Sequence, residues 1–168
     1  MLRTLTAVLA LALAAWAETA AGVKWTMPKG WTAEAPRQMR AATYRVPAAA
    51  GDAEAGECGV YFFGSGQGGT VEANLDRWTK QFEPAAHPPK ITKETINGLS
   101  VTRVDVSGTY TGAGGPMATA KTAKPGYRLL GAVVEAPEGL VFFKFTGPAK
   151  TVTANQAAFQ GLLKSLSR

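Results

Sequence analysis

One amphipathic segment, residues 70–82, carries the side chains best spaced to bind a ligand. Its apolar residues recur at helical spacing and form one stripe, made by Val71, Leu75, Trp78 and Phe82. With about 100° of turn per residue, Asn74, Arg77 and Gln81 line one side of that stripe. A planar guanidinium between two amides could bind an anion or a protein partner. The same side chains could instead cap strand ends and loop carbonyls, and the sequence leaves both interpretations open.

A glycine-rich loop, Gly64 to Gly69, comes directly before this helix and matches the pattern G-x-G-x-x-G. The pattern does not indicate a dinucleotide site here, because that site needs a parallel βαβ unit and an antiparallel hairpin follows this helix. Backbone N–H groups at the start of a helix can still hold phosphate, sulfate or carboxylate, and we predict Gly66, Gly68 and Gly69 as candidates. The alternative is a flexible loop that binds nothing.

A long irregular stretch, Gly108 to Gly126, contributes Lys121 and Lys124. Loops of this length are uncommon inside compact domains and are usually functional or disordered. The stretch is therefore either disordered or a lid that orders over a partner. In the second case Lys121 and Lys124 add positive charge to the Arg77 surface.

The residue types that catalysis and metal binding require are sparse. His87 is the only histidine and lies in a proline-containing linker without other ligands at metal-binding spacing. Cys58 is the only cysteine and begins an apolar strand, which predicts a small buried hydrophobic side chain. A reactive thiol would need a base or a helix N-terminus nearby, and the sequence leaves its reactivity open. No G-x-S-x-G motif occurs, and the carboxylates are scattered. We therefore predict no catalytic residues, no metal site, no cofactor and no enzymatic activity.

Residues 1–17 have the features of a cleaved secretory signal peptide. Arg3 precedes an apolar run from Leu5 to Ala15, and Ala15-Trp16-Ala17 is a small-residue cleavage motif. The apolar run is shorter than the roughly 20 residues that span a bilayer. We predict a periplasmic or secreted protein in which residues 18–168 form one domain without a transmembrane segment.

The formal net charge of the chain is +6, and loss of Arg3 with the signal peptide leaves +5. A modestly basic surface can favour an acidic protein partner or an anionic envelope surface, but it can also be only a solvated surface. No window contains five or six clustered Lys and Arg residues. Binding of nucleic acid is therefore not predicted.

The clearest strand signals lie in the last third of the chain. Tyr127 to Glu135 and Leu140 to Thr146 are apolar on both faces, which predicts a central antiparallel pair covered on both sides. Upstream, Asn97-Gly98 predicts a type I′ turn between strands 91–96 and 99–107, nearer the edge of the sheet.

Shorter strands are expected at residues 41–46 and 57–63, and a helix is expected after Gly147-Pro148, with Thr153 and Gln156 as its capping box. These elements predict a single-domain α+β fold with a mostly antiparallel sheet of about six strands flanked by helices.

Both ends of the mature chain resemble PsbP-like domains. The similar positions are Phe142 to Pro148, Thr151, Val152, Phe159 and Leu163 to Leu166 near the C-terminus, and Trp25, Pro28, Gly30 and Trp31 near the N-terminus. This resemblance implies an α/β/α sandwich, shared with a Ran-binding nuclear import protein and with small exported bacterial proteins of unknown role. It implies binding or assembly assistance, and it transfers no functional residues because the matched positions are packing positions.

Our leading hypothesis from the sequence is an exported accessory protein that contacts a protein partner or the envelope surface. The alternative is a binder of small anions or other small ligands that uses the Gly64 to Gly69 loop and Arg77.

Overall fold

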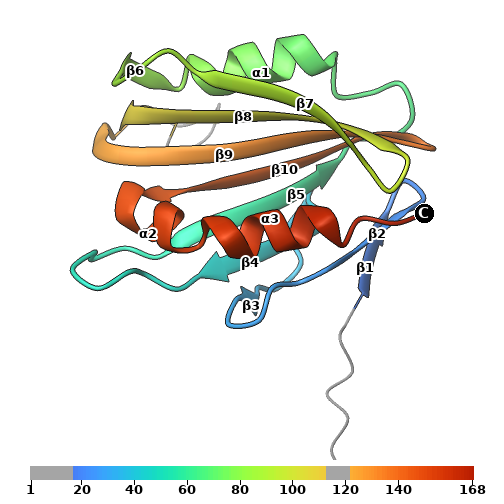
Figure 1. Cartoon of the computed structure of the whole chain (residues 1–168), viewed down its shortest axis with the longest axis horizontal. Coiled ribbons are helices and arrows are strands. Elements are labelled where there is room, and N and C mark those ends of the chain that lie inside the picture. The colour runs from blue at the N-terminus through green and yellow to red at the C-terminus, as the bar shows by residue number, and fades with distance from the viewer. Residues whose placement is uncertain (1–16, 113–121) are drawn as a thin grey trace, which may run out of the picture.

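Strands from the whole chain form one antiparallel sheet of eight strands in the computed structural model, which describes residues 17–112 and 122–168 (Figure 1). The spatial order is β3-β4-β5-β10-β9-β8-β6, and β7 also pairs with β8. The strands are β3 (Thr32–Ala33), β4 (Ala42–Val46), β5 (Gly56–Phe62), β6 (Phe82–Ala85), β7 (Lys90–Ile96), β8 (Leu99–Tyr110), β9 (Lys124–Ala136) and β10 (Gly139–Pro148). The sheet has more strands than the predicted six because β3 and β6 are too short to give an alternating pattern.

The predicted central pair is confirmed, since β10 lies between β9 and β5. Its turn follows the expected chemistry: Gly139 has φ 137°, a conformation that favours glycine. Phe143 points to one face of the sheet and Phe142 to the other, and both are almost fully buried. Apolar residues at successive positions therefore indicate a strand that is covered on both faces.

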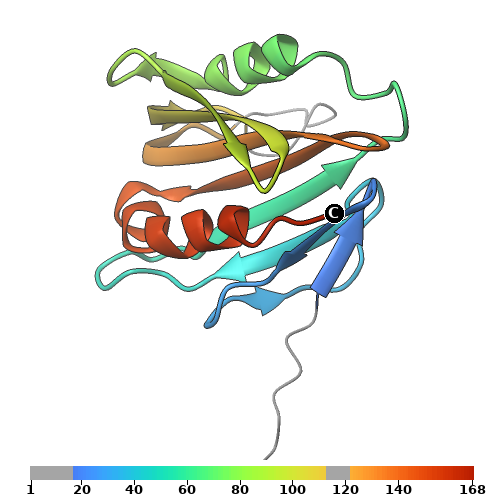
Figure 2. The same cartoon turned by 45° about the vertical axis from the view of Figure 1, so that its right-hand side comes forward.

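Helices cover the two faces of the sheet. The helix α1 (Val71–Thr79) packs on one face, and α2 (Ala149–Ala154) and α3 (Gln156–Lys164) pack on the other (Figures 1 and 2). Leu75 and Trp78 belong to the core on the α1 side, while Phe159 and Leu163 belong to the larger core on the α3 side. The predicted α/β/α sandwich is thus confirmed.

The second predicted hairpin is also confirmed. Asn97 and Gly98 have φ values of 49° and 79°, as a type I′ turn requires, and β7 lies outside β8 at the edge of the sheet. The side-chain amide of Asn97 also donates to the carbonyls of Lys164 and Leu166, at 3.2 and 2.7 Å. This turn therefore fixes the end of α3 against the sheet.

A separate two-stranded hairpin of β1 (Ala17–Ala20) and β2 (Val23–Thr26) packs beside α3. Trp25 is buried there, and its indole N–H donates to the hydroxyl of Tyr44 at 2.7 Å. Tyr44 in turn donates to Glu18. The proposed signal peptide lies outside the described residues except for Ala17, so its cleavage stays a prediction.

The sequence placed the end of the first helix too late. The helix α1 begins after the N-cap Thr70, as expected, but it ends at Thr79 and not at Phe82. Lys80 is the C-cap, and Phe82 pairs with Tyr110 as the first residue of β6. Phe82 is buried in the same core as the apolar side of α1. Its position in the sequence therefore fits the helical spacing, although the residue lies in a strand.

The predicted capping box was wrong. Thr153 lies inside α2, and Asn155, which precedes α3, makes no side-chain cap. The hydroxyl of Thr153 instead accepts a hydrogen bond from Arg128 at 2.9 Å. Helix formation begins earlier than expected because Pro148 occupies the N-cap of α2 with φ −53° and has no N–H to satisfy.

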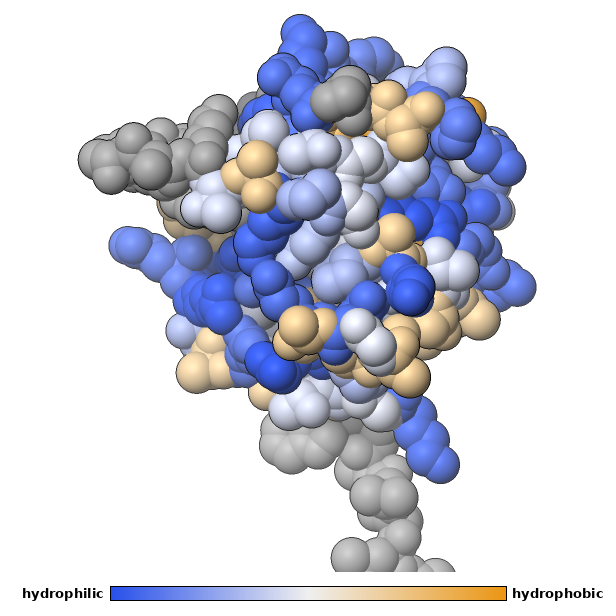
Figure 3. All heavy atoms as spheres, turned by 90° about the vertical axis from the view of Figure 1, so that its left-hand side faces the viewer, coloured by the Kyte–Doolittle hydropathy of each residue, from blue (hydrophilic) through white to orange (hydrophobic). Residues whose placement is uncertain are grey.

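Large exposed apolar side chains are few in the described ranges: Met39 and Ile91 are 68% and 53% exposed. Figure 3 shows the face at the β6 and α2 end of the molecule, where hydrophilic residues predominate and apolar residues form small groups. No helix within residues 17–112 and 122–168 is long and apolar enough to cross a membrane.

Candidate functional site

A groove of about 1110 Å³ lies on the α1 side of the sheet. The end of α1 and the segment after it form one wall, and the loop before β5 forms another. The ends of β8 and β9 complete the groove. Its floor is the α1-facing surface of β5 and β10. The charged side chains around it are Arg40, Glu54, Glu57, Asp76, Arg77, Lys80, Lys124 and Lys144.

The floor of the groove is built by the alternation of β10. Phe142, Lys144 and Thr146 share the α1 side, whereas the residues between them enter the α3 core. In register, Lys144 lies opposite Gly59 of β5 and Gly131 of β9. Because neither neighbour has a side chain, aromatic rings from elsewhere can lie directly beside Lys144.

Trp78 and Tyr61 are the rings that use this space. A Cβ atom on Gly131 would lie 2.5 Å from the ring of Trp78, and one on Gly59 would lie 2.7 Å from the hydroxyl of Tyr61. The two glycines therefore allow a tryptophan and a tyrosine to flank the lysine.

Gly131→Ala is expected to lower the free energy of unfolding by about 1 to 3 kcal/mol, because the added methyl group overlaps the ring of Trp78. Urea denaturation monitored by circular dichroism measures the change. Gly161→Ala on α3 is the matched control, since no atom lies within 4 Å of its added Cβ. The control should be neutral or stabilising, and an equal loss in both variants would contradict the close approach.

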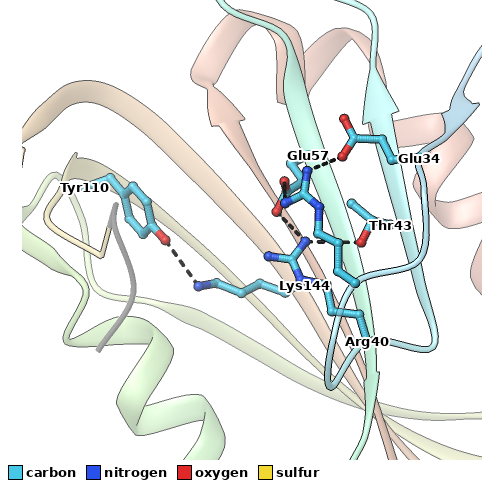
Figure 4. Close-up of polar contacts among 7 residues, drawn as sticks. Glu34, Arg40, Thr43, Glu57, Tyr110 and Lys144 are labelled. Atoms are coloured by element: carbon cyan, nitrogen blue, oxygen red, sulfur yellow. Dashed lines mark hydrogen bonds and ion pairs between the residues drawn. The ribbon is translucent and has the colours of Figure 1, made fainter. Parts of the chain in front are cut away.

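The hydrogen-bond partners of the Lys144 ammonium are uncharged. Nζ donates to Oε1 of Gln81 at 2.7 Å and to the hydroxyl of Tyr110 at 3.3 Å. In Figure 4 the side chain extends from β10 toward Tyr110, away from the Arg40–Glu57 pair. Burial, with help from the charges of Arg77 and Arg40 and against that of Glu57, lowers the pKa of Lys144 to about 8.

Most other cations of the groove are already paired. Arg40 contacts Glu57 at 2.7 Å, Lys80 contacts Asp76 at 2.7 Å, and Lys124 contacts Glu54. Within the described residues, Arg77 and Lys144 are the groove cations that have no carboxylate at salt-bridge distance. The groove therefore has positive charge available for an anion.

Aromatic rings form the rest of the lining. Tyr110 and Tyr127 stack with their centroids 5.9 Å apart and an interplanar angle of 3°. Tyr61 stacks on Phe63 at 6.1 Å and lies under the guanidinium of Arg40 at 5.2 Å. Such walls suit a planar or apolar body beside a charged group.

The structure brings only some of the predicted site residues together. Arg77, Gln81 and Lys124 line the groove, but Asn74 does not. Asn74 is buried, and its amide donates to the carbonyls of Gly68 and Thr70 at 2.7 and 2.8 Å. Its oxygen accepts from Arg77. Asn74 therefore caps loop carbonyls and does not face the groove. It holds the loop before α1 and positions Arg77.

The predicted glycines lie in the loop before α1 and not in the groove lining. Gly66, Gly68 and Gly69 all have positive φ, between 69° and 88°. A Cβ on Gly68 would also lie 2.9 Å from the ring of Phe63, so close packing requires glycine there. Lys121, the remaining predicted residue, lies outside the described residues.

Sequence reasoning missed the residue at the centre of the groove. Lys144 is the one charged residue in the apolar run from Leu140 to Phe145, and a charge inside a strand covered on both faces is a signal for a special role. Tyr61, Tyr110 and Tyr127 carried no comparable signal. Their convergence depends on strand pairing between distant segments.

The described residues contain no cluster of three His, Cys, Asp or Glu side chains that could hold a metal ion. His87 is exposed in the segment between β6 and β7. Cys58 is fully buried, as predicted, and burial raises the pKa of its thiol.

Comparison with known proteins places the fold. No protein-family model and no curated protein matches the sequence. Among solved structures, the PsbP protein of the cyanobacterium Synechocystis matches with a TM-score of 0.54, covering 97% of this chain and 98% of its own. This chain has a PsbP-like fold. The resemblance inferred from the two ends of the chain is thereby confirmed.

A Pseudomonas aeruginosa protein of unknown function also matches, with a TM-score of 0.48, 14% sequence identity, and coverage of 91% of this chain and 96% of its own. Identity to the cyanobacterial protein is 12%. At such identities the likeness concerns the PsbP-like fold alone, and the function must be argued from the groove.

Proposed function

We propose that this chain is a non-enzymatic, exported binding protein whose groove holds a small organic anion. The observation that carries the proposal is the pair of cations without carboxylate partners, Arg77 and Lys144, in a groove with aromatic walls. Arg77 lies exposed beside the groove and Lys144 lies at its floor. An anion between them would gain two charge-assisted hydrogen bonds.

The shape of the groove favours a small ligand over a flat surface. Its volume of about 1110 Å³ is slightly above the range of ordinary ligand sites, which span roughly 300 to 1,000 Å³. Lys144 is recessed, so a broad anionic envelope surface would reach Arg77 more easily than Lys144.

An accessory role agrees with the PsbP-like fold, and a protein partner remains the second candidate function. The feature that favours it is the exposed guanidinium of Arg77 at the groove edge. Affinity recovery of partners from an envelope extract would separate the two functions. Residues 18–168 serve as the bait, with and without phenyl phosphate. A stoichiometric partner that phenyl phosphate displaces would favour protein binding at the Arg77 edge of the groove, and an extract that yields no partner would favour the small anion.

Thermal melting and calorimetric titration at pH 7 test the small-anion proposal, with phosphate, sulfate, benzoate and phenyl phosphate as probes. We expect the aromatic anions to raise the melting midpoint most, because a ligand that binds only the folded chain stabilises it. Lys144→Met should weaken binding at least about tenfold, since a hydrogen bond to a charged group contributes about 1.5 to 3 kcal/mol.

Lys93→Met is the control for that titration. Lys93 is exposed on β7 outside the groove and lies 3.8 Å from Glu135, so its loss should leave binding unchanged. A panel in which no anion shifts the midpoint, or in which Lys144→Met binds as the unmodified chain does, would exclude the groove as an anion site.

A further inference from the structure

Lys144 differs from an ordinary anion-binding lysine in how its amine is held. Its Nζ donates to Gln81 at 2.7 Å, a hydroxyl lies 3.3 Å away on Tyr110, and no carboxylate of the described residues is at salt-bridge distance. We propose that the Lys144 amine captures aldehydes or ketones that carry an anionic group, by forming a reversible imine. This inference rests on the proposed function, because the same groove must first bind the anionic ligand.

The geometry supplies each part of that step. The two N–H groups of the neutral amine can donate to Oε1 of Gln81 and to the hydroxyl of Tyr110, and the nitrogen lone pair then points away from both acceptors. The nitrogen attacks the carbonyl carbon, a C–N bond forms, and the carbonyl oxygen takes up a proton to give a carbinolamine. Loss of water then breaks the C–O bond and leaves a C=N bond. The oxygen leaves with the two hydrogens of the amine, and nothing is oxidised or reduced.

Tyr110 is placed to assist the proton transfer. Its hydroxyl is the nearest O–H to Nζ, and burial raises the pKa of Tyr110 to about 12. It therefore stays protonated at neutral pH and can donate to the developing oxyanion. Arg77 lies on the same wall as Gln81 and would hold the anionic end of the ligand, away from the reacting carbon.

The amine must lose its proton before it can attack, and its surroundings favour that loss. The charged or titratable groups that line the groove with it are Asp76, Arg77 and Lys80 at α1, Arg40 before β4, Glu54, Glu57 and Tyr61 at β5, Tyr110 on β8, and Lys124 and Tyr127 on β9. Burial and the two arginines outweigh the opposing effect of Glu57, and the pKa of Lys144 falls to about 8. A lysine desolvated beside other cations is the usual form of an amine nucleophile.

Trapping with para-carboxybenzaldehyde and sodium cyanoborohydride tests the inference. The full chain is incubated with both reagents at pH 7.5, and peptide mass spectrometry locates the reduced adduct. We expect Lys144 to be labelled at least about tenfold faster than the exposed Lys93, and phenyl phosphate to suppress labelling at Lys144 only. Benzaldehyde, which lacks the anionic group, should label Lys144 more slowly.

Lys144→Arg separates the inference from the proposed function. The arginine keeps the positive charge but cannot form an imine, so this variant should give no adduct at position 144, whatever its affinity for phenyl phosphate. If the unmodified chain binds phenyl phosphate but Lys144 is labelled no faster than Lys93, the imine is wrong and the anion site stands. If phenyl phosphate neither binds nor protects Lys144, both proposals are wrong.

Discussion

Trp78→Ala is expected to lower the free energy of unfolding by about 3 to 5 kcal/mol, the range for removing a large buried aromatic side chain. Trp78 is 3% exposed, and its ring lies edge-on to Phe142, with centroids 6.4 Å apart at 82°. It also fills the space above Gly131. The ring thus joins α1 to the two central strands. Urea denaturation followed by circular dichroism measures the loss.

A double-mutant cycle with Gly131→Ala checks the cause of that loss. The extra methyl group overlaps the ring of Trp78 and approaches Val104 within 2.9 Å. Once the ring is absent, Gly131→Ala should cost at least about 1 kcal/mol less than it does in the unmodified chain, as expected for residues in direct contact. Additive effects would show that the two residues stabilise the fold independently. A loss below about 1 kcal/mol for Trp78→Ala alone would contradict its role in joining α1 to the sheet.

Loss of this ring should also alter the groove, because Trp78 lines it beside Lys144. The two effects can be separated by measuring anion binding well below the melting midpoint, where the variant is still folded. Weaker binding there would show that Trp78 also shapes the site.

Local sequence signals were sufficient for most of the fold. The turn at Asn97 and Gly98 follows from two positions that need positive φ, and the central pair follows from strands that are apolar on both faces. Each signal is contained in about ten consecutive residues. The errors occurred where a tertiary contact replaced a local one. Phe82 pairs with Tyr110 in a strand although its spacing fits a helix, and Thr153 bonds to Arg128 although its spacing to Gln156 fits a capping box.

The candidate site depends on register between distant strands, so only part of it could be predicted from local sequence patterns. Arg77 and Gln81 were found because they share a short segment. The charge of Lys144 inside an apolar run is a local signal, but the space around it depends on Gly59 and Gly131, which come from the strands on either side of β10. Neither glycine is in a turn pattern, and their purpose is visible only when Trp78 and Tyr61 are seen against them.

Placing a lysine in this setting has a cost to the fold. A desolvated ammonium beside other cations is less stable than one in water, and the lowered pKa measures that difference. Residues retained at a cost to stability are often functional. The loss of stability caused by the Lys144 ammonium can be measured without any ligand, and it therefore tests the lowered pKa independently.

Lys144→Met is therefore expected to be more stable than the unmodified chain at pH 7. The pKa of Lys144 is about 8 in the folded protein and near 10.5 when unfolded. The penalty for the buried charge is fully present below pH 8 and is lost as the pH rises toward 10.5, because the folded chain releases its proton first. Between pH 7 and 9.5 the unmodified chain should gain about 2 kcal/mol relative to Lys144→Met.

Urea denaturation at half-unit steps from pH 7 to 9.5 measures the free energy of unfolding of both proteins. The difference between them should narrow as the pH rises. This pH range stops below the titration of the tyrosines around the groove. Other titrating groups contribute equally to the free energy of unfolding of both proteins, so their contributions cancel in the difference. Lys93→Met, which removes an exposed lysine, should differ from the unmodified chain by less than about 1 kcal/mol at every pH. A difference for Lys144→Met that stays constant across this range would mean that the amine titrates as an ordinary lysine. The nucleophilic role inferred for it would then lose its physical basis, whereas a difference that begins to narrow near pH 8 would show that the folded groove holds a neutral amine just above physiological pH.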